Sequence, residues 1–303
     1  ALFNTSYNVG KSFYLQDGTV KYGPVENGYK EYIQLLKRWM EKGLIDQDIV
    51  STDWKNVDAK FLSGKTGAGI GTVGAKLGKY IMLAREKGDE KFDLVAAPLP
   101  KKTKNDPTPL REKPQVYTGA GSAAITTKNK NQELSAKVLD YFFSEEGAML
   151  KNFGVNGVTY NLENGYPKYM EMITKNPDGL AMAQAMAKYF RSNAQAPGIG
   201  NDKRYLEQYY ELPQQQKAIE AFSTNMVDGI TYPVTINYSD EETAQIAKIM
   251  SDVETYKNEM FVKFLLGSEP IENFDKYVQT IKNLGIDQVI NIKQEAYKNY
   301  MAQ

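Results

Sequence analysis

Residues 239–267, SDEETAQIAKIMSDVETYKNEMFVKFLLG, contain the clearest secondary-structure signal in the chain. Ser239 and Glu242 have the spacing of a capping box, in which each side chain bonds the other residue's backbone N–H at a helix start. Apolar residues then recur at helical spacing until the closing glycine, which favours a left-handed helix end. Two more helices are expected at 271–284 and 288–301, so the pattern predicts a helical C-terminal region.

Upstream of this region, predicted strands alternate with predicted helices. Short apolar segments at 68–73, 92–97 and 117–126 are expected to form strands, and amphipathic patterns at 28–42 and 132–143 predict helices. Strands that alternate with helices are typical of α/β domains. We therefore expect an α/β fold with a helical C-terminal elaboration.

Turn residues mark further boundaries in the first part of the chain. Residues 17–24 have the composition of a hairpin-like turn followed by a strand. Gly43 is placed to end the helix at 28–42 in a left-handed conformation, with Leu44 folding back as its apolar contact. Residues 98–114 contain five prolines and many charges, which predicts a loop or linker.

The composition excludes several classes of function. The 303 residues are 42% hydrophobic and 24% charged, a balance typical of a folded protein. Lys+Arg and Asp+Glu both number 37, so the chain lacks the basic surplus that nucleic-acid binding requires. There is no histidine and no cysteine. Disulfides, thiolate or imidazole metal sites, Ser-His-Asp triads and Cys–His pairs are therefore impossible.

Motifs for cofactor or catalytic chemistry are incomplete. Glu145 and Glu146 are neighbours, so on a helix they do not face each other as the two carboxylates of a glycosidase do. Residues 64–66 read Gly-Lys-Thr, but Ala59 stands where a phosphate-binding loop needs its first glycine. The G-x-G-x-x-G match at 69–74 lacks the ribose-binding acid that confirms a dinucleotide site. We expect no cofactor, metal or catalytic residue, although a carboxylate pair assembled from distant residues is left open.

The 21 tyrosines favour a binding surface. Many of them lie in turn-rich segments, and a tyrosine offers a flat apolar ring with a hydrogen-bonding tip, which suits the faces and hydroxyl edges of sugars. Any single tyrosine is still more often an ordinary packing residue than a ligand contact.

Three segments together resemble a known family. Residues 61–68, FLSGKTGA, followed by two spaced glycines, are similar to a segment of the extracellular solute-binding proteins of ABC importers. Residues 96–100 and 119–127, with the helix that ends at 142–147, resemble the hinge crossing and return strand of maltose-binding-protein-like folds. The resemblance implies a periplasmic-binding-protein-like fold of type II, mostly its C-terminal lobe.

A narrower resemblance is to the large lipoproteins of Gram-positive bacteria in this family, extracellular solute-binding proteins of family 1. It rests on 29–32 with 43–46, on 154–160 (GVNGVTY), and on ordered matches from Tyr238 to Tyr300. It implies that the chain begins near the entry to the second lobe. The signal peptide, the lipid-anchor cysteine and most of the first lobe, including the calcium loop of some relatives, would lie outside it. The chain has no initiator methionine, no signal peptide and no apolar run long enough to span a bilayer.

The resemblance also implies a division into lobe segments. Residues 1–100 would be the first segment of the C-terminal lobe, and 101–116 the hinge or linker. Residues 117–165 would return to the N-terminal lobe as a strand and a helix, and 166–303 would form the helical segment of the C-terminal lobe.

The implied function is that of a receptor which is not an enzyme. It would capture an extracellular carbohydrate-like solute, an oligosaccharide or uronate, in an interlobe cleft and deliver it to ABC permease subunits. The protein would be a monomer on the cell surface, held to the membrane only through its lipid anchor, with no nucleic-acid partner. Two alternatives stay open: a carbohydrate-processing enzyme of the glycoside hydrolase type, and a peptide-binding module.

Candidate ligand residues are those that match the loops lining the solute cleft in the family. Tyr117 and Tyr160 are expected as stacking or edge contacts, and Asn156 and Ser122 as hydroxyl partners. Arg204 would be an anion partner if the ligand is acidic. The full set is Thr72, Val73, Gly74, Tyr117, Thr118, Ser122, Asn156, Tyr160, Arg204 and Tyr205.

Overall fold

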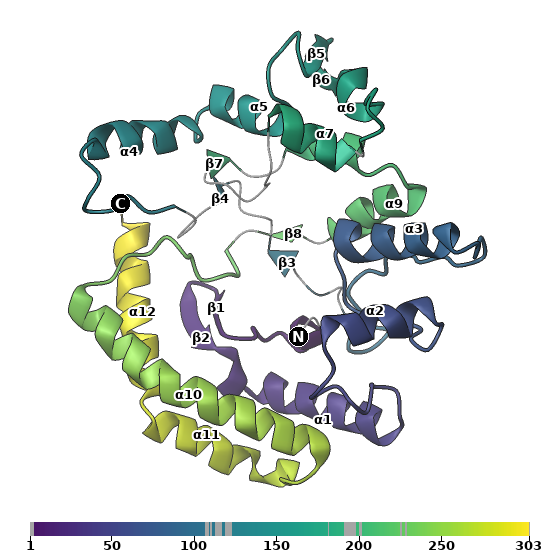
Figure 1. Ribbon diagram of the computed structural model, residues 1–303. Helices are drawn as coiled ribbons and strands as arrows, with labels where there is room; N and C mark the ends of the chain where they lie inside the picture. The colour runs from purple at the N-terminus through teal and green to yellow at the C-terminus, as the bar shows by residue number, and fades with distance from the viewer. Residues whose placement is uncertain are drawn as a thin grey trace. The chain divides into compact units, whose positions relative to one another are not determined.

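The computed structural model divides the chain into two compact units (Figure 1). The first unit combines residues 1–72, 79–113 and 220–303, and the second combines 73–78 and 114–219. Both are rich in helices, and the described residues add four two-stranded sheets. The structure describes residues 3–106, 109, 111–112, 117–118, 123–180, 182–190, 198–199, 202–224, 226–227 and 229–302.

The first unit contains a hairpin, a short parallel strand pair and most of the long helices. Among its described residues, β1 pairs with β2 antiparallel and β3 pairs with β8 in parallel. Its elements are η1 (Phe3–Tyr7), β1 (Phe13–Gln16), β2 (Thr19–Tyr22), η2 (Gly23–Val25), α1 (Asn27–Glu41), α2 (Trp54–Leu62), α3 (Lys79–Glu86), β3 (Arg111–Glu112), β8 (Met226–Val227), α10 (Asp240–Leu266), η4 (Ile271–Asn273), α11 (Phe274–Asn283) and α12 (Ile286–Met301).

Helices α1, α10, α11 and α12 enclose the main core of this unit. Ile33 of α1, Val253 of α10, Ile281 of α11 and Val289 of α12 are all completely buried and belong to one hydrophobic cluster. Burying such a side chain stabilises the fold by roughly 1.5–3 kcal/mol. The apolar stripes seen in the sequence therefore converge on one core, and the predicted helical C-terminal region is confirmed.

The ends of these helices follow the predicted signals, with one exception. The Ser239 hydroxyl accepts the Glu242 backbone N–H at 3.2 Å and Glu242 Oε2 accepts the Ser239 backbone N–H at 2.8 Å, which confirms the capping box. Gly43 ends α1 with φ +67°. The backbone N–H of Leu44 then bonds the Trp39 carbonyl at 2.8 Å. The predicted apolar contact of Leu44 is wrong, because its side chain is 68% exposed.

The β1–β2 hairpin is closed by a two-residue turn. Gln16 pairs with Thr19, and Asp17 and Gly18 between them have φ of +51° and +76°. Both central residues of a type I′ turn need positive φ, and Asp-Gly meets that need at little cost. The predicted hairpin-like turn is confirmed.

Both edges of this hairpin are covered by distant segments of the same unit. The side chain of Gln294 on α12 accepts the Val20 N–H at 2.8 Å and donates to the Gly18 carbonyl at 3.2 Å. On the other edge the Leu15 N–H donates to the Ile230 carbonyl at 3.0 Å. A two-stranded hairpin is marginal on its own, so this covering stabilises it.

The second unit contains shorter helices around two antiparallel strand pairs, β4–β7 and β5–β6. Its elements are η3 (Val73–Gly78, a π-helix), β4 (Tyr117–Thr118), α4 (Gln132–Tyr141), α5 (Glu145–Phe153), β5 (Tyr160–Glu163), β6 (Tyr166–Tyr169), α6 (Glu171–Thr174), α7 (Met182–Tyr189), β7 (Gly198–Ile199), α8 (Lys203–Tyr209) and α9 (Pro213–Phe222), which begins here.

The predicted strands are the main error of the sequence reading. Residues 68–72 have no regular structure and lead into η3, and 92–97 are irregular as well. Of the strand expected at 117–126, β4 covers 117–118, while 123–126 are irregular and 119–122 lie outside the described residues. A strand is stable only when its N–H and C=O groups pair with a neighbour, and apolar composition alone does not supply that partner. The mixed α/β class holds, with more helix and less strand than expected.

Candidate functional site

Three neighbouring candidates, Thr72, Val73 and Gly74, fall at the boundary between the units. Thr72 is exposed and ends the first segment of the first unit. Val73 and Gly74 begin η3 in the second unit, where the Val73 carbonyl accepts the side-chain amide of Gln215 at 3.2 Å. A Cβ built on Gly74 would lie 3.1 Å from the ring of Tyr210, so the backbone approaches that ring closely. The structure thus joins η3 to the segment that starts α9.

The next candidates lie on a short strand. Tyr117 and Thr118 form β4, whose residues pair with Ile199 and Gly198 of β7. Ser122 lies outside the described residues, so its predicted hydroxyl contact stays a prediction.

The loop 154–160, GVNGVTY, is held in place from within. Gly154 has φ +83°, a conformation that L side chains rarely adopt, and a Cβ there would lie 2.3 Å from the Thr159 hydroxyl oxygen. That buried hydroxyl donates to the Phe153 carbonyl at 2.6 Å and accepts the Val155 N–H at 2.8 Å. The tight loop leaves Asn156 exposed to solvent, and its expected contact with a solute hydroxyl stays a prediction.

Tyr160 and Tyr205 are packing residues of the second unit. Tyr160 is 6% exposed, and its ring centroid lies 5.7 Å from that of Phe153. Tyr205 is 7% exposed and belongs to the same hydrophobic cluster, together with Tyr169 and Ile173. Each ring buries apolar area against its neighbours. Both tyrosines therefore belong to the buried core of this unit, and their direct contact with solute stays a prediction.

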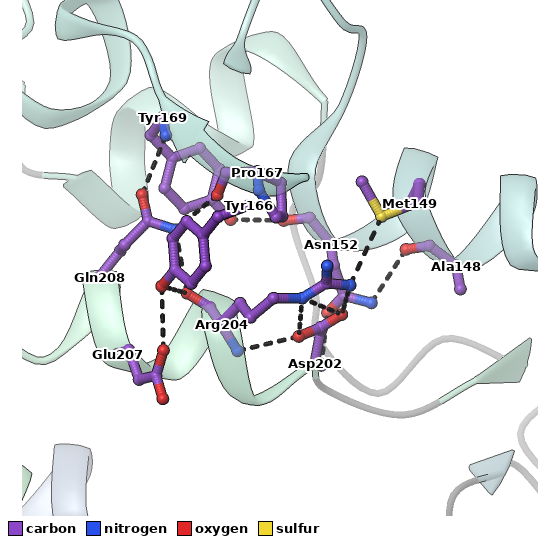
Figure 2. A network of polar contacts seen from close by, with 10 residues as sticks. All are labelled: Ala148, Met149, Asn152, Tyr166, Pro167, Tyr169, Asp202, Arg204, Glu207 and Gln208. Atoms are coloured by element: carbon purple, nitrogen blue, oxygen red, sulfur yellow. Dashed lines mark hydrogen bonds and ion pairs between the residues drawn. The ribbon is translucent and has the colours of Figure 1, made fainter. Parts of the chain in front are cut away.

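Arg204 forms a two-point ion pair with Asp202, as Figure 2 shows. Its Nε donates to Asp202 Oδ1 at 3.0 Å and its Nη2 donates to Oδ2 at 2.6 Å. Asp202 Oδ1 also accepts the Arg204 backbone N–H at 2.8 Å and so caps α8. The guanidinium carbon lies 5.7 Å from the ring centroid of the buried Phe153. The pair is fixed on one side by a helix start and on the other by an aromatic ring.

The pKa values follow from this pairing. Hydrogen bonding to Asp202 raises the pKa of Arg204 above its usual value, with burial acting in the opposite sense. Burial alone would raise the pKa of Asp202, but the hydrogen bonds and the charge of Arg204 outweigh it and hold that pKa below its ordinary range. Both groups are therefore charged at neutral pH, and each neutralises the other.

Asn152, at the end of α5, joins the same network. Its side chain accepts the Asp202 backbone N–H at 3.1 Å and donates to the Ala148 carbonyl at 2.9 Å. Its own carbonyl accepts the Tyr169 hydroxyl. Through its side-chain amide and its backbone carbonyl, the buried Asn152 thus connects α5, β6 and the start of α8.

Gln208 and Glu207 of α8 complete the polar face drawn in Figure 2. Gln208 accepts the Tyr169 N–H at 2.9 Å and donates to the Pro167 carbonyl at 2.8 Å, which fastens β6 to α8. The Tyr166 hydroxyl donates to Glu207 Oε2 at 2.9 Å. Burial and this bond to Glu207 both raise the pKa of Tyr166, so its hydroxyl keeps its proton at neutral pH.

Sequence reasoning selected Arg204 but missed the residues that surround it. Asp202 could have been found, because an aspartate just before a helical pattern is a preferred N-cap. Asn152, Glu207 and Gln208 carry no local signal, since their partners lie on other elements. The network supplies hydrogen-bond donors and acceptors in fixed positions.

No group of three or more Asp, Glu, His or Cys side chains among the described residues could hold a metal ion. Within the same part of the chain, no helix is long and apolar enough to cross a membrane.

Comparison with known proteins shows what the chain is similar to. Residues 3–149 match the model of the family described as bacterial extracellular solute-binding protein. The fructooligosaccharide ABC transporter substrate-binding protein FusA of Streptococcus pneumoniae serotype 4 is 22% identical over 301 residues, covering 94% of this chain and 52% of that protein.

Two solved structures extend the match to the fold. The alginate-binding protein AlgQ2, solved without calcium ion, is similar with a TM-score of 0.67 and 25% identity, over 98% of this chain and 61% of that one. An HMO-binding, ABC-transporter-associated solute-binding protein from Bifidobacterium longum infantis has a TM-score of 0.62 and 17% identity, over 99% and 61%.

These matches relate the chain to the extracellular solute-binding proteins of family 1, and its fold is periplasmic-binding-protein-like. The resemblance seen in the sequence is confirmed at this level. The chain spans 52% of the curated relative and 61% of these two solved chains. The Gram-positive lipoprotein type and the division into lobe segments stay predictions.

Proposed function

We propose that this chain is part of the substrate-binding component of an ABC importer, which captures an extracellular oligosaccharide and delivers it to permease subunits. The observation that carries the proposal is the likeness of fold over 98–99% of the chain to an alginate-binding protein and to FusA, which was solved in complex with fructo-nystose and with kestose. Three different saccharides on one fold favour a carbohydrate over a peptide.

Binding without turnover is part of the same proposal. The relatives are binding proteins by name. The chain has no histidine or cysteine, and the charged groups of the polar face on α8 form the ion pairs Asp202–Arg204 and Lys203–Glu207. Such groups suit fixed hydrogen bonds to hydroxyls better than proton transfer, which needs a group free to change its protonation state.

The location and assembly are proposed from the same likeness. An extracellular protein held at the cell surface by an N-terminal lipid anchor, and acting as a monomer, would meet its permease at the membrane. A mass measurement of the full-length protein extracted from cells, by light scattering and by mass spectrometry, tests the monomer and the anchor separately.

The function is tested on the full-length protein by thermal unfolding in the presence of fructooligosaccharides, alginate oligosaccharides and peptides. A saccharide present at 100 times its Kd should stabilise the folded state by about 2.7 kcal/mol, which raises the Tm. Product analysis after long incubation should find the saccharide intact. Stabilisation by peptides alone, or cleavage of a glycosidic bond, would contradict the proposal.

A further inference from the structure

The Asp202–Arg204 pair leaves part of the arginine available for a ligand. Arginine has five N–H groups, and the contacts of Arg204 within the described residues involve Nε and Nη2, whose partners are Asp202 and the Met149 sulfur at 3.9 Å. In Figure 2 the remaining terminal nitrogen, Nη1, makes no contact with the residues drawn. The side chain is 38% exposed. A solute can therefore accept hydrogen bonds from Arg204 without displacing Asp202.

For an acidic solute, by contrast, the positive charge of Arg204 is already neutralised by Asp202. The carboxylate of Asp202 occupies both the guanidinium fork and the backbone N–H of Arg204 at the start of α8. The next basic residue, Lys203, pairs with Glu207 at 3.5 Å. A uronate carboxylate placed at Arg204 would lie beside two carboxylates, and like charges at short range oppose binding.

We propose that Arg204 is a specificity-determining residue whose neutralised guanidinium donates to sugar hydroxyls, so that this site selects neutral saccharides over uronates. The proposal rests on the proposed function, because it assumes that the polar face of α8 meets the saccharide. Hydroxyl donors held in fixed geometry discriminate well, since a ligand that lacks the matching acceptor leaves them unpaired.

The first test is calorimetry on the full-length protein with fructooligosaccharides and with alginate oligosaccharides of equal length. The tightest ligand should be neutral, and it should bind at least about ten-fold more tightly than any uronate, the effect of about one charge-assisted hydrogen bond. A uronate that binds as tightly as the best neutral sugar overturns this inference and leaves the proposed function standing. Failure of every saccharide to bind overturns both.

The second test uses Asp202→Asn, which keeps an N-cap side chain of the same shape and releases the charge of Arg204. Affinity for alginate oligosaccharides should rise about ten-fold, and the preference for neutral over acidic saccharides should fall accordingly. Unchanged affinity for alginate oligosaccharides overturns the inference.

Arg204→Lys keeps the charge and removes the planar fork, so it should lower neutral-saccharide affinity about ten-fold. Unaltered affinity in this variant also overturns the inference. The matched control is Asp178→Asn, which breaks a solvent-exposed ion pair with Lys188 in the same unit. Its affinities for both classes should equal those of the wild type. Circular dichroism melts of all three variants establish that each one is folded.

Discussion

The hairpins β1–β2 and β5–β6 are built alike and used differently. Each is closed by a two-residue turn with both φ values positive, Asp17-Gly18 in one and Asn164-Gly165 in the other. In the first unit, α12 and the segment at 230 cover both edges of the hairpin with hydrogen bonds. In the second unit, β5–β6 presents aromatic rings to a core and polar groups to α8.

The segment that packs against a hairpin, and not its turn, therefore decides the role of the hairpin in the structure. The same local chemistry yields a covered structural element where a helix side chain occupies the strand edge, and a polar face where α8 packs against β6. Four experiments test this difference between the two hairpins.

The largest effect is expected from Phe153→Ala, which removes the ring that joins β5–β6 to α8. Phe153 is completely buried against Tyr160 and Tyr169, so its loss should lower the free energy of unfolding by about 3–5 kcal/mol. Urea denaturation measures the change. Leu134→Ala, at a side chain 60% exposed on α4, is the control and should stay within about 0.5 kcal/mol. Similar losses for both would show that the cluster does not hold this unit together.

Gly154→Ala should disturb the loop that leads into β5. Its φ of +83° and the 2.3 Å approach of a Cβ to the Thr159 hydroxyl predict a loss of about 1–3 kcal/mol and weaker solute binding. Gly157→Ala shares the positive φ, at +77°, but meets no atom within 4 Å. Urea midpoints that are the same for both variants would mean that the stability loss comes from backbone strain rather than from the contact with Thr159.

Gln294→Ala uncovers one edge of β1–β2. The variant loses two hydrogen bonds to the hairpin backbone and should lower the free energy of unfolding by about 1–2 kcal/mol. Hydrogen exchange should accelerate at the Val20 amide, which loses its acceptor, and not in β5–β6. Gln279→Ala, which removes an exposed side-chain bond to Asn283, serves as the control. Unchanged exchange at Val20 would contradict the covering role of Gln294.

The smallest effect concerns alkaline pH and Tyr14 of β1. Burial, reinforced by the charge of Glu26, raises the pKa of Tyr14 to about 12. This folded-state pKa lies above the unfolded value of 10.0. The contribution of Tyr14 to the free energy of unfolding is therefore fully present below pH 10 and is lost as pH rises towards 12. Tyr14→Phe should therefore lose less stability across this window than the wild type. Parallel pH profiles of the urea midpoint would contradict the assignment.

Much of the fold could be predicted where the signal is local. The capping box at Ser239, the left-handed glycine at Gly43 and the Asp-Gly turn each depend on a few neighbouring residues, and the structure contains all of them. Asn164-Gly165 carries the same local hairpin signal and also closes a hairpin, between Glu163 and Tyr166. The strand predicted at 92–97 is wrong because its signal is not local. An apolar run indicates a preference for burial, but it does not indicate that a neighbouring strand is present to pair with it.

The sequence by itself determined the helices, the turns and the absence of histidine and cysteine chemistry, since these depend on residue type and short spacing. It also pointed to Arg204 as a candidate. Only the tertiary structure decided that Tyr160 and Tyr205 pack inward and that Asp202 neutralises Arg204. Burial and charge pairing depend on segments far apart in the chain, such as α5, β6 and α8. No local pattern encodes which of them meet.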